Sequence, residues 1–126
     1  MRFTRSDVHS CQQATEPISA NIRPAALRSQ KVVGKLRADL GFQGIIMADD
    51  LDSQATMRGD PVAEVAIDAL NAGCHFLLLA DTGSQLDDVA AAIETAAQSG
   101  RLSAEALSAS ADRVRALARD YATDGR

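Results

Sequence analysis

The fold of this chain is decided by the stretch Gly41-Phe42-Gln43-Gly44-Ile45-Ile46-Met47-Ala48-Asp49-Asp50-Leu51. Its order predicts a turn, then a short apolar strand over 44–48, then two carboxylates where the strand ends. A carboxylate at that point costs little stability only if it lies in a polar cleft or has partners. In parallel α/β sheets and barrels, the carboxyl ends of the strands carry the chemistry. The stretch therefore predicts that Asp49 faces an active site.

The elements around this stretch predict a βαβ unit. A second apolar run at 76–80 predicts another buried strand, and both runs read as strands buried on both faces. Asp60 is predicted to cap the intervening helix, with Pro61 at its first position. The loop before this cap is predicted to span 49–60. Apolar residues at helical spacing predict helices over 26–40, 61–72, 85–98 and from Ser103 onward.

Two predicted strands are too few for an independent sheet. A typical sheet has about five or six strands, and the polar, irregular arm at 1–23 adds one at most. Both strands nevertheless read as buried and therefore need neighbours. We expect the chain to be part of a larger α/β domain, or to need a partner.

Composition excludes several classes of function. The net charge is -4 and no basic patch stands out, which argues against a nucleic-acid partner. Aromatic residues are only 3%, too few for a self-contained sugar-binding or base-stacking platform. No apolar run approaches the roughly 20 residues that span a bilayer. Residues 1–20 lack the apolar segment of a signal peptide, so we expect a cytoplasmic location, with a signal upstream of Met1 left open.

The two cysteines suggest neither a disulfide framework nor a zinc site. Cys11 and Cys74 are far apart in the chain and lie outside any metal-binding spacing. We expect both to be free thiols without a functional role.

The chain resembles the N-terminal domain of glycoside hydrolase family 3, in particular its β-N-acetylhexosaminidase branch. The resemblance rests on Pro24-Ala25-Ala26, on a helix ending Leu36-Arg37-Ala38-Asp39-Leu40-Gly41-Phe42-Gln43-Gly44, and on Asp49-Asp50-Leu51 after the strand. The later Ala72-Gly73 before a strand and Gly100-Arg101-Leu102-Ser103 also agree with the family pattern. Asp50 stands where the β-glucosidase branch commonly has Trp, which favours the hexosaminidase branch.

The resemblance implies a (β/α)8 TIM barrel that is incomplete in this chain. Such barrels need about 250 residues, so residues 24–122 would form the closing, C-terminal portion, between the arm at 1–23 and a short tail at 123–126. The implied activity is that of a retaining glycosidase releasing terminal N-acetylglucosamine from oligosaccharides, without a cofactor. A β-glucosidase-type member of the family, or a non-catalytic remnant that folds only by association, remains the alternative.

The resemblance assigns the nucleophile to Asp49. Retaining hydrolysis needs a carboxylate that attacks the anomeric carbon while a second group protonates the leaving oxygen. The branch takes its acid/base from an Asp-x-His pair far upstream. Asp7-Val8-His9 has that spacing but lies too close to Asp49, and we interpret it as a chance pair. The family's Lys-His region is absent, and Ala48 and Ser53 replace the usual Ser or Thr and Met.

The other polar residues near the motif have structural interpretations. Asp50 and Asp52 are expected to order the loop or to be solvated, although an acidic cluster also leaves a divalent cation as an alternative. His75 is expected to pack at the strand end opposite Asp49, and Arg37 to be solvated or ion-paired. Asp81-Thr82-Gly83-Ser84 leaves open a phosphate-binding turn at a helix start.

Overall fold

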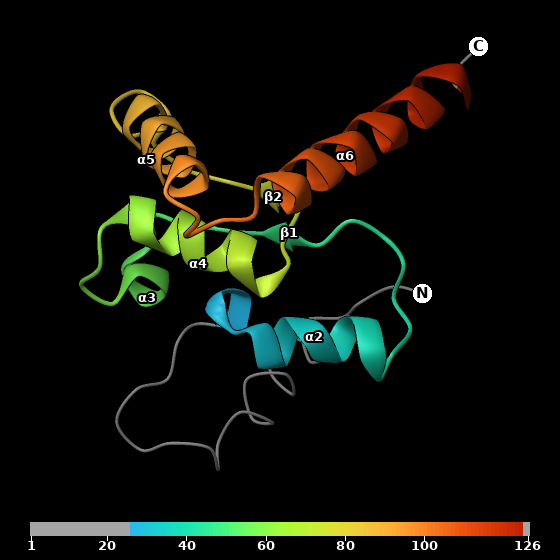
Figure 1. Cartoon of the computed structure of the whole chain (residues 1–126), viewed down its shortest axis with the longest axis horizontal. Helices are drawn as coiled ribbons and strands as arrows, with labels where there is room; N and C mark the ends of the chain where they lie inside the picture. The colour runs from blue at the N-terminus through green and yellow to red at the C-terminus, as the bar shows by residue number, and fades with distance from the viewer. Residues whose placement is uncertain (1–25, 125–126) are drawn as a thin grey trace.

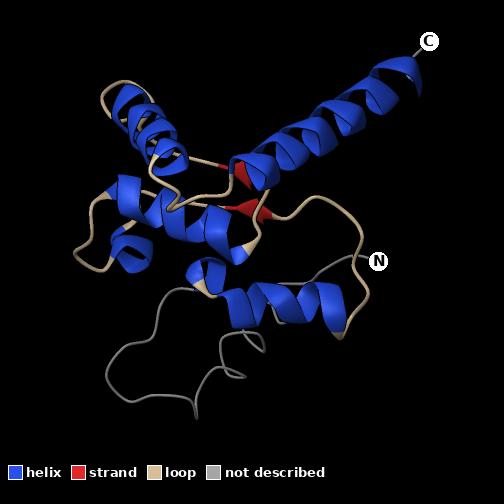
Figure 2. Cartoon of the chain, viewed as in Figure 1, coloured by secondary structure: helices blue, strands red, loops and turns tan. Residues whose placement is uncertain are grey.

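The computed structural model describes residues 26–124, which form six helical elements around a two-stranded parallel sheet (Figures 1 and 2). The elements are η1 (Ala26–Arg28), α2 (Gln30–Ala38), β1 (Met47–Ala48), α3 (Gln54–Met57), α4 (Val62–Ala72), β2 (Phe76–Leu77), α5 (Leu86–Gln98) and α6 (Ala104–Asp124). The predicted irregular arm at 1–23, the pair at 7–9 and Cys11 lie outside the described residues.

The predicted βαβ unit is confirmed. Strand β1, helix α4 and strand β2 follow in order, and the strands pair in parallel with Met47 opposite Phe76. Helix α4 ends where predicted, because Gly73 takes the left-handed conformation at its C-cap, with φ 109°. The two strand ends thus point in the same direction, which places the loops that follow them at one edge of the sheet.

The strands are shorter than predicted, and only one face of the sheet is buried. Ile46 and Ala48 are buried, whereas Met47 keeps 53% of its surface exposed and its partner Phe76 keeps 38%. The prediction of strands buried on both faces is therefore wrong for the described residues. Burial of the second face and extension of the ladder both need neighbouring elements, and the described residues supply two strands.

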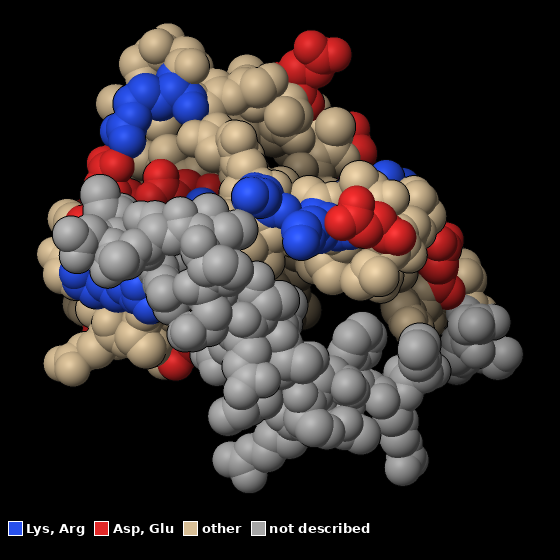
Figure 3. Space-filling view, turned by 90° about the horizontal axis from the view of Figure 1, so that it is seen from below, with Lys and Arg blue, Asp and Glu red and all other residues tan. Residues whose placement is uncertain are grey.

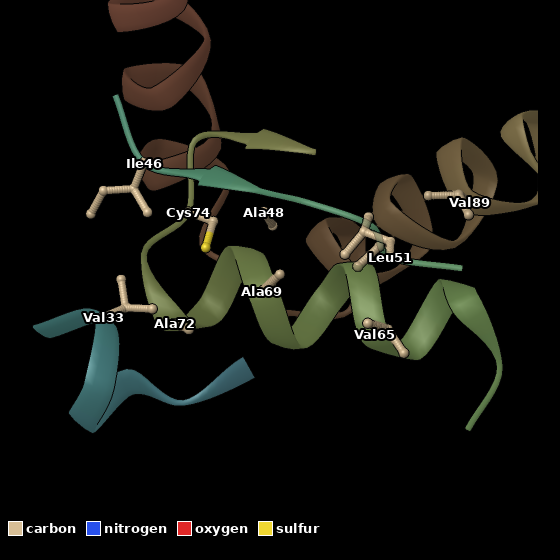
Figure 4. Packing of buried hydrophobic residues seen from close by; sticks show 10 residues of the cluster. Val33, Ile46, Ala48, Leu51, Val65, Ala69, Ala72, Cys74 and Val89 are labelled. Carbon is tan, nitrogen blue, oxygen red and sulfur yellow. The ribbon is translucent and has the colours of Figure 1, made fainter. Parts of the chain in front are cut away.

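Helix α4 forms the centre of the core. Its Val65 and Ala69 are fully buried beneath the strands, and Leu51, from the loop after β1, is fully buried beside them (Figure 4). Helix α5 packs on α4 and contributes Val89 to the same cluster. Full burial of a valine or leucine side chain such as Val65, Leu51 or Val89 contributes about 1.5–3 kcal/mol, so these residues hold the loop after β1 against the helix.

Three local predictions differ from the structure. The predicted helix at 26–40 is divided at Ser29, whose hydroxyl caps α2 by accepting from Val32 N–H. Asp60 does not cap α4. Pro61 occupies the N-cap instead, and the Asp60 carboxylate pairs with Arg28 at 2.6 Å. The predicted loop at 49–60 contains the short helix α3.

Helix α6 starts as predicted and extends away from the body. Ser103 Oγ accepts a hydrogen bond from Ala106 N–H and so caps the first turn. The C-terminal half of the helix projects beyond the other elements (Figure 1), and Leu117 and Tyr121 remain exposed there. Within residues 26–124, no helix is both long enough and apolar enough to cross a membrane.

Candidate functional site

Asp49 immediately follows β1, at the edge of the sheet where β2 also ends. Its side chain is exposed, and among the described residues none donates a hydrogen bond to it. Two residues later Leu51 is fully buried, and its N–H donates to the carbonyl of Leu78 at 3.0 Å. Asp49 is thus an accessible carboxylate on backbone that is fixed on both sides, by strand pairing before it and by the Leu51 anchor after it.

Asp52 joins the loop after β1 to the loop after β2. Its Oδ1 accepts from Ala80 N–H at 2.9 Å, and its Oδ2 accepts from Asp81 N–H at 2.8 Å. These two backbone donors hold the pKa of Asp52 below its usual value, because they stabilise the carboxylate form. The prediction that Asp52 orders the loop is therefore confirmed.

The pKa of Asp50 is shifted in the opposite direction to that of Asp52. A side-chain hydrogen bond to Asp52 raises the pKa of Asp50 above its usual value. Burial and the neighbouring carboxylates of Asp52 and Asp49 act in the same direction, since each disfavours a further negative charge. Asp50 and Asp52 are thus chemically distinct: Asp52 keeps its proton less readily than an ordinary aspartate, and Asp50 takes one up more readily.

The turn after β2 does not have the form of a phosphate site. Asp81 Oδ1 accepts from Gly83 N–H at 3.0 Å, and its Oδ2 accepts from Ser84 Oγ at 2.8 Å. A bound anion would need these donors, but they already donate to the Asp81 carboxylate. They also hold the pKa of Asp81 below its usual value. A bound phosphate would meet that negative charge, so the geometry argues against the phosphate-binding interpretation of this turn.

No group of metal-ligating side chains is found within residues 26–124. Among these residues, no three or more His, Cys, Asp or Glu side chains lie close enough together to hold a metal ion, the acidic residues after β1 included. The cation alternative for this loop therefore has no support from the described geometry.

His75 lies at the opposite end of the strands from Asp49 and has a structural role, as expected. Its Nδ1 accepts from Ile46 N–H at 3.1 Å, which completes the ladder where β1 begins. Burial, followed by the positive charge of Arg37, lowers the pKa of His75 below its usual value. The neutral ring is the form that can accept this hydrogen bond.

Arg37 makes specific contacts that were not predicted, because hydrogen bonds and an aromatic ring hold its guanidinium. Its Nη1 donates to the carbonyl of Phe42 at 2.6 Å, and its guanidinium lies 5.6 Å from the centroid of the Phe42 ring. The same ring explains Gly44, since a Cβ there would lie 2.6 Å from Phe42 Cζ. Arg37, Phe42 and Gly44 thus form one packed turn that leads into β1.

Cys74 is a free, buried thiol, as predicted. Burial raises its pKa to about 11, which leaves it protonated at neutral pH. A buried neutral thiol is a poor nucleophile, so Cys74 has a packing role under β2.

Two stabilising features were not predicted from the sequence. The bonds from Asp52 to the loop after β2 join residues 28 and 29 positions apart, and no local pattern signals them. The other is Arg28, whose guanidinium pairs with Asp60 and Asp68 at 2.6 Å each. The only signal in the sequence was that Arg28 directly precedes Ser29, the cap of α2. This local position does not identify Asp60 and Asp68 as its partners, because they lie far along the chain.

The comparisons with known proteins all lead to one family. The model of the "Glycosyl hydrolase family 3 N terminal domain" matches residues 7–117. A beta-hexosaminidase of Methylobacillus flagellatus is 35% identical over 69 residues, which cover 55% of this chain and 20% of that protein. A beta-hexosaminidase of Nitrosomonas eutropha is 32% identical over 71 residues, which cover 56% of this chain and 20% of that protein.

A solved structure shows the same similarity in three dimensions. It is a glycoside hydrolase family 3 beta-N-acetylglucosaminidase from a Paenibacillus strain, with a TM-score of 0.76 and 31% identity. The match covers 90% of this chain and 21% of that chain. The chain thus spans about a fifth of the length of the relatives it matches.

Proposed function

The chain belongs to the glycosyl hydrolase family 3 N-terminal domain family, and from this we propose that it forms the nucleophile-bearing part of a retaining glycosidase. The substrate class we propose is an oligosaccharide with a terminal N-acetylglucosamine. The beta-hexosaminidase relatives support this substrate, as does the beta-N-acetylglucosaminidase among the solved structures. The chain would supply the closing part of a (β/α)8 barrel, and the remainder of the barrel would supply the acid/base.

The observation that carries this proposal is the position of Asp49. It is an exposed carboxylate at the carboxyl end of a parallel strand, where barrel enzymes place catalytic groups. In the proposed reaction Asp49 attacks the anomeric carbon and forms a covalent glycosyl ester, while an acid outside this chain protonates the departing oxygen. Water then attacks the ester, the same outside group takes its proton, and Asp49 is released as a carboxylate.

The test is hydrolysis of an aryl N-acetyl-β-glucosaminide by the full-length protein and by its Asp49→Asn variant. An amide cannot act as this nucleophile, so we expect the variant to lose at least about a thousandfold in kcat. Asp88→Asn is the matched control, since Asp88 is an exposed aspartate in the first turn of α5. Full turnover by Asp49→Asn would remove Asp49 from the nucleophile role. Faster hydrolysis of an aryl glucoside would instead favour the β-glucosidase type.

The open sheet favours a second candidate, a non-catalytic remnant that folds only by association. Met47 and Phe76 are paired neighbours on the exposed face of a sheet that has two strands in the described residues. Circular dichroism and size-exclusion chromatography of the 126-residue chain distinguish the candidates. A compact monomer with a cooperative thermal transition would contradict the remnant, whereas a transition that appears only in larger species would support it.

A further inference from the structure

The loop that carries Asp49 is connected by side-chain hydrogen bonds to the loop after β2. Asp52 contributes both carboxylate oxygens, one to Ala80 N–H and one to Asp81 N–H. Hydrogen bonds from backbone amides to a carboxylate are about twice as strong as neutral ones. Because each of the two oxygens accepts from a different one of two successive amides, the orientation of the Asp52 carboxyl plane is also fixed. The hydrogen bonds therefore fix how the two loops are oriented as well as holding them together.

The same hydrogen-bonded chain continues within the second loop. Asp81, whose amide donates to Asp52, uses its own carboxylate to accept from Gly83 N–H and Ser84 Oγ. The two loops at the carboxyl edge of the sheet therefore form one unit. We call this unit the Asp52 bridge, defined by Asp52 and the amides of Ala80 and Asp81.

The Asp52 bridge lies three residues after Asp49, and the backbone between the two residues is held at several points. Leu51 lies between Asp49 and Asp52, is fully buried, and donates its N–H to Leu78 O. Strand pairing through Ala48 fixes the other side of Asp49, because Leu78 N–H donates to Ala48 O at 2.9 Å. Asp49 thus lies on a segment whose far end is secured by a buried leucine and by the bridge. Without the bridge, the backbone after Leu51 loses its connection to the β2 side.

We propose that Asp52 is a positioning residue, which holds the backbone of the loop that carries Asp49 by bridging the loops after β1 and β2. This inference rests on the proposed function for its catalytic meaning, whereas the bridge itself is a property of the folded chain. Asp52 does not contact the substrate in this scheme. It acts through the backbone between residues 49 and 52.

Nuclear magnetic resonance of the isotopically labelled full chain tests the bridge without any substrate. In the wild type, the amide signals of Ala80 and Asp81 should move together with the Asp52 carboxyl signal as it titrates, at a pH below the usual range for aspartate. The backbone amide signal of Asp49 should shift with the same transition. A wild-type spectrum in which these amides ignore the Asp52 titration would overturn the proposal.

Substitutions separate positioning from general stability. Asp52→Asn retains one acceptor and presents an amide group to the second N–H, so exchange of the Ala80 and Asp81 amides should accelerate by about tenfold or more. The backbone amide signal of Asp49 should shift in the same variant. Asp52→Glu retains the charge and should restore part of both signals, and Asp88→Asn should change neither. An unchanged Asp49 amide signal in Asp52→Asn would refute a positioning role even if the thermal stability of the variant falls.

Kinetics connect the bridge to the reaction. In the full-length protein, Asp52→Asn should lower kcat about tenfold or more while KM changes less than about threefold, because misdirection of a nucleophile affects the transition state more than binding. Equal kcat values in Asp52→Asn and wild type would overturn the catalytic part. Full turnover by Asp49→Asn would instead contradict the proposed function. The magnetic resonance data would still show whether Asp52 bridges the two loops.

Discussion

Replacement of Arg28 by alanine should destabilise the chain more than any surface ion pair can. The Arg28 side chain is 10% exposed, and it pairs with Asp60 and Asp68 and also donates to the carbonyl of Met57. It thereby joins η1 to the end of α3 and to α4. Burial opposes the charge of this guanidinium, but the hydrogen bonds to Asp68 and Asp60 raise its pKa overall.

The expected loss follows from these contacts. The carboxylates of Asp60 and Asp68 are 51% and 41% exposed, so each pair is screened by water and contributes about 0.5–1 kcal/mol. The bond to Met57 O, which is 3.3 Å long, adds about 0.5–1 kcal/mol. Both carboxylates recover water when Arg28 is removed, and no buried charge is left behind. The sum is a loss of about 2 kcal/mol in the free energy of unfolding.

Urea unfolding followed by circular dichroism measures this loss, and a double-mutant cycle with Asp68→Asn isolates the pair. We expect a coupling of about 0.5–1 kcal/mol between Arg28 and Asp68. Arg115→Ala is the matched control, because Arg115 pairs with Asp112 while both side chains are more than half exposed, at 67% and 73%. Its effect should stay within about 0.5 kcal/mol. An Arg28→Ala variant as stable as the Arg115→Ala variant would refute this reasoning.

Two further predictions concern the turn and the histidine at the start of β1. Gly44→Ala would place a Cβ 2.6 Å from Phe42 Cζ, the tip of a ring that is 42% exposed and can turn away, so it should cost about 1 kcal/mol or less in urea unfolding. Gly34→Ala, within α2 and with nothing within 4 Å of its added Cβ, should instead stabilise by about 0.5–1 kcal/mol. Because the folded-state pKa of His75 lies below its unfolded value, stability should be unaffected above about pH 6.5 and should fall as the pH decreases below it. His75→Gln should flatten that decrease between pH 7.5 and 5.5, and an unchanged slope would show that His75 does not cause it.

Features set by neighbouring residues were predictable from the sequence. Gly73 ends α4 in the left-handed conformation, and Ser103 caps α6 with its hydroxyl. Parallel pairing of the strands followed from the strand–helix–strand order. These outcomes depend on the backbone preferences of a few adjacent residues, which the sequence displays directly.

Features set by distant residues were not predictable. Asp60 would cap α4 in isolation, but Arg28, 32 positions earlier, competes for its carboxylate. Helix α3 was missed because a four-residue helix depends on a single cap, in which Ser53 Oγ accepts from Thr56 N–H. Exposure of Met47 and Phe76 could not be predicted either, because a continuous apolar run does not reveal whether neighbouring elements cover both faces of the strand.

The described residues organise the candidate site more completely than they organise the sheet. The outer face at Met47 and Phe76 is open, yet the segment that carries Asp49 is secured by Leu51 and by Asp52 through bonds made within this chain. Elements that complete the sheet would therefore cover apolar surface and pair strand edges without having to rebuild the Asp49 loop. The order of the Asp49 loop and the completion of the sheet therefore contribute separately to the site. The Asp52→Asn experiments test the order of the loop, and circular dichroism with size-exclusion chromatography tests whether the sheet needs association.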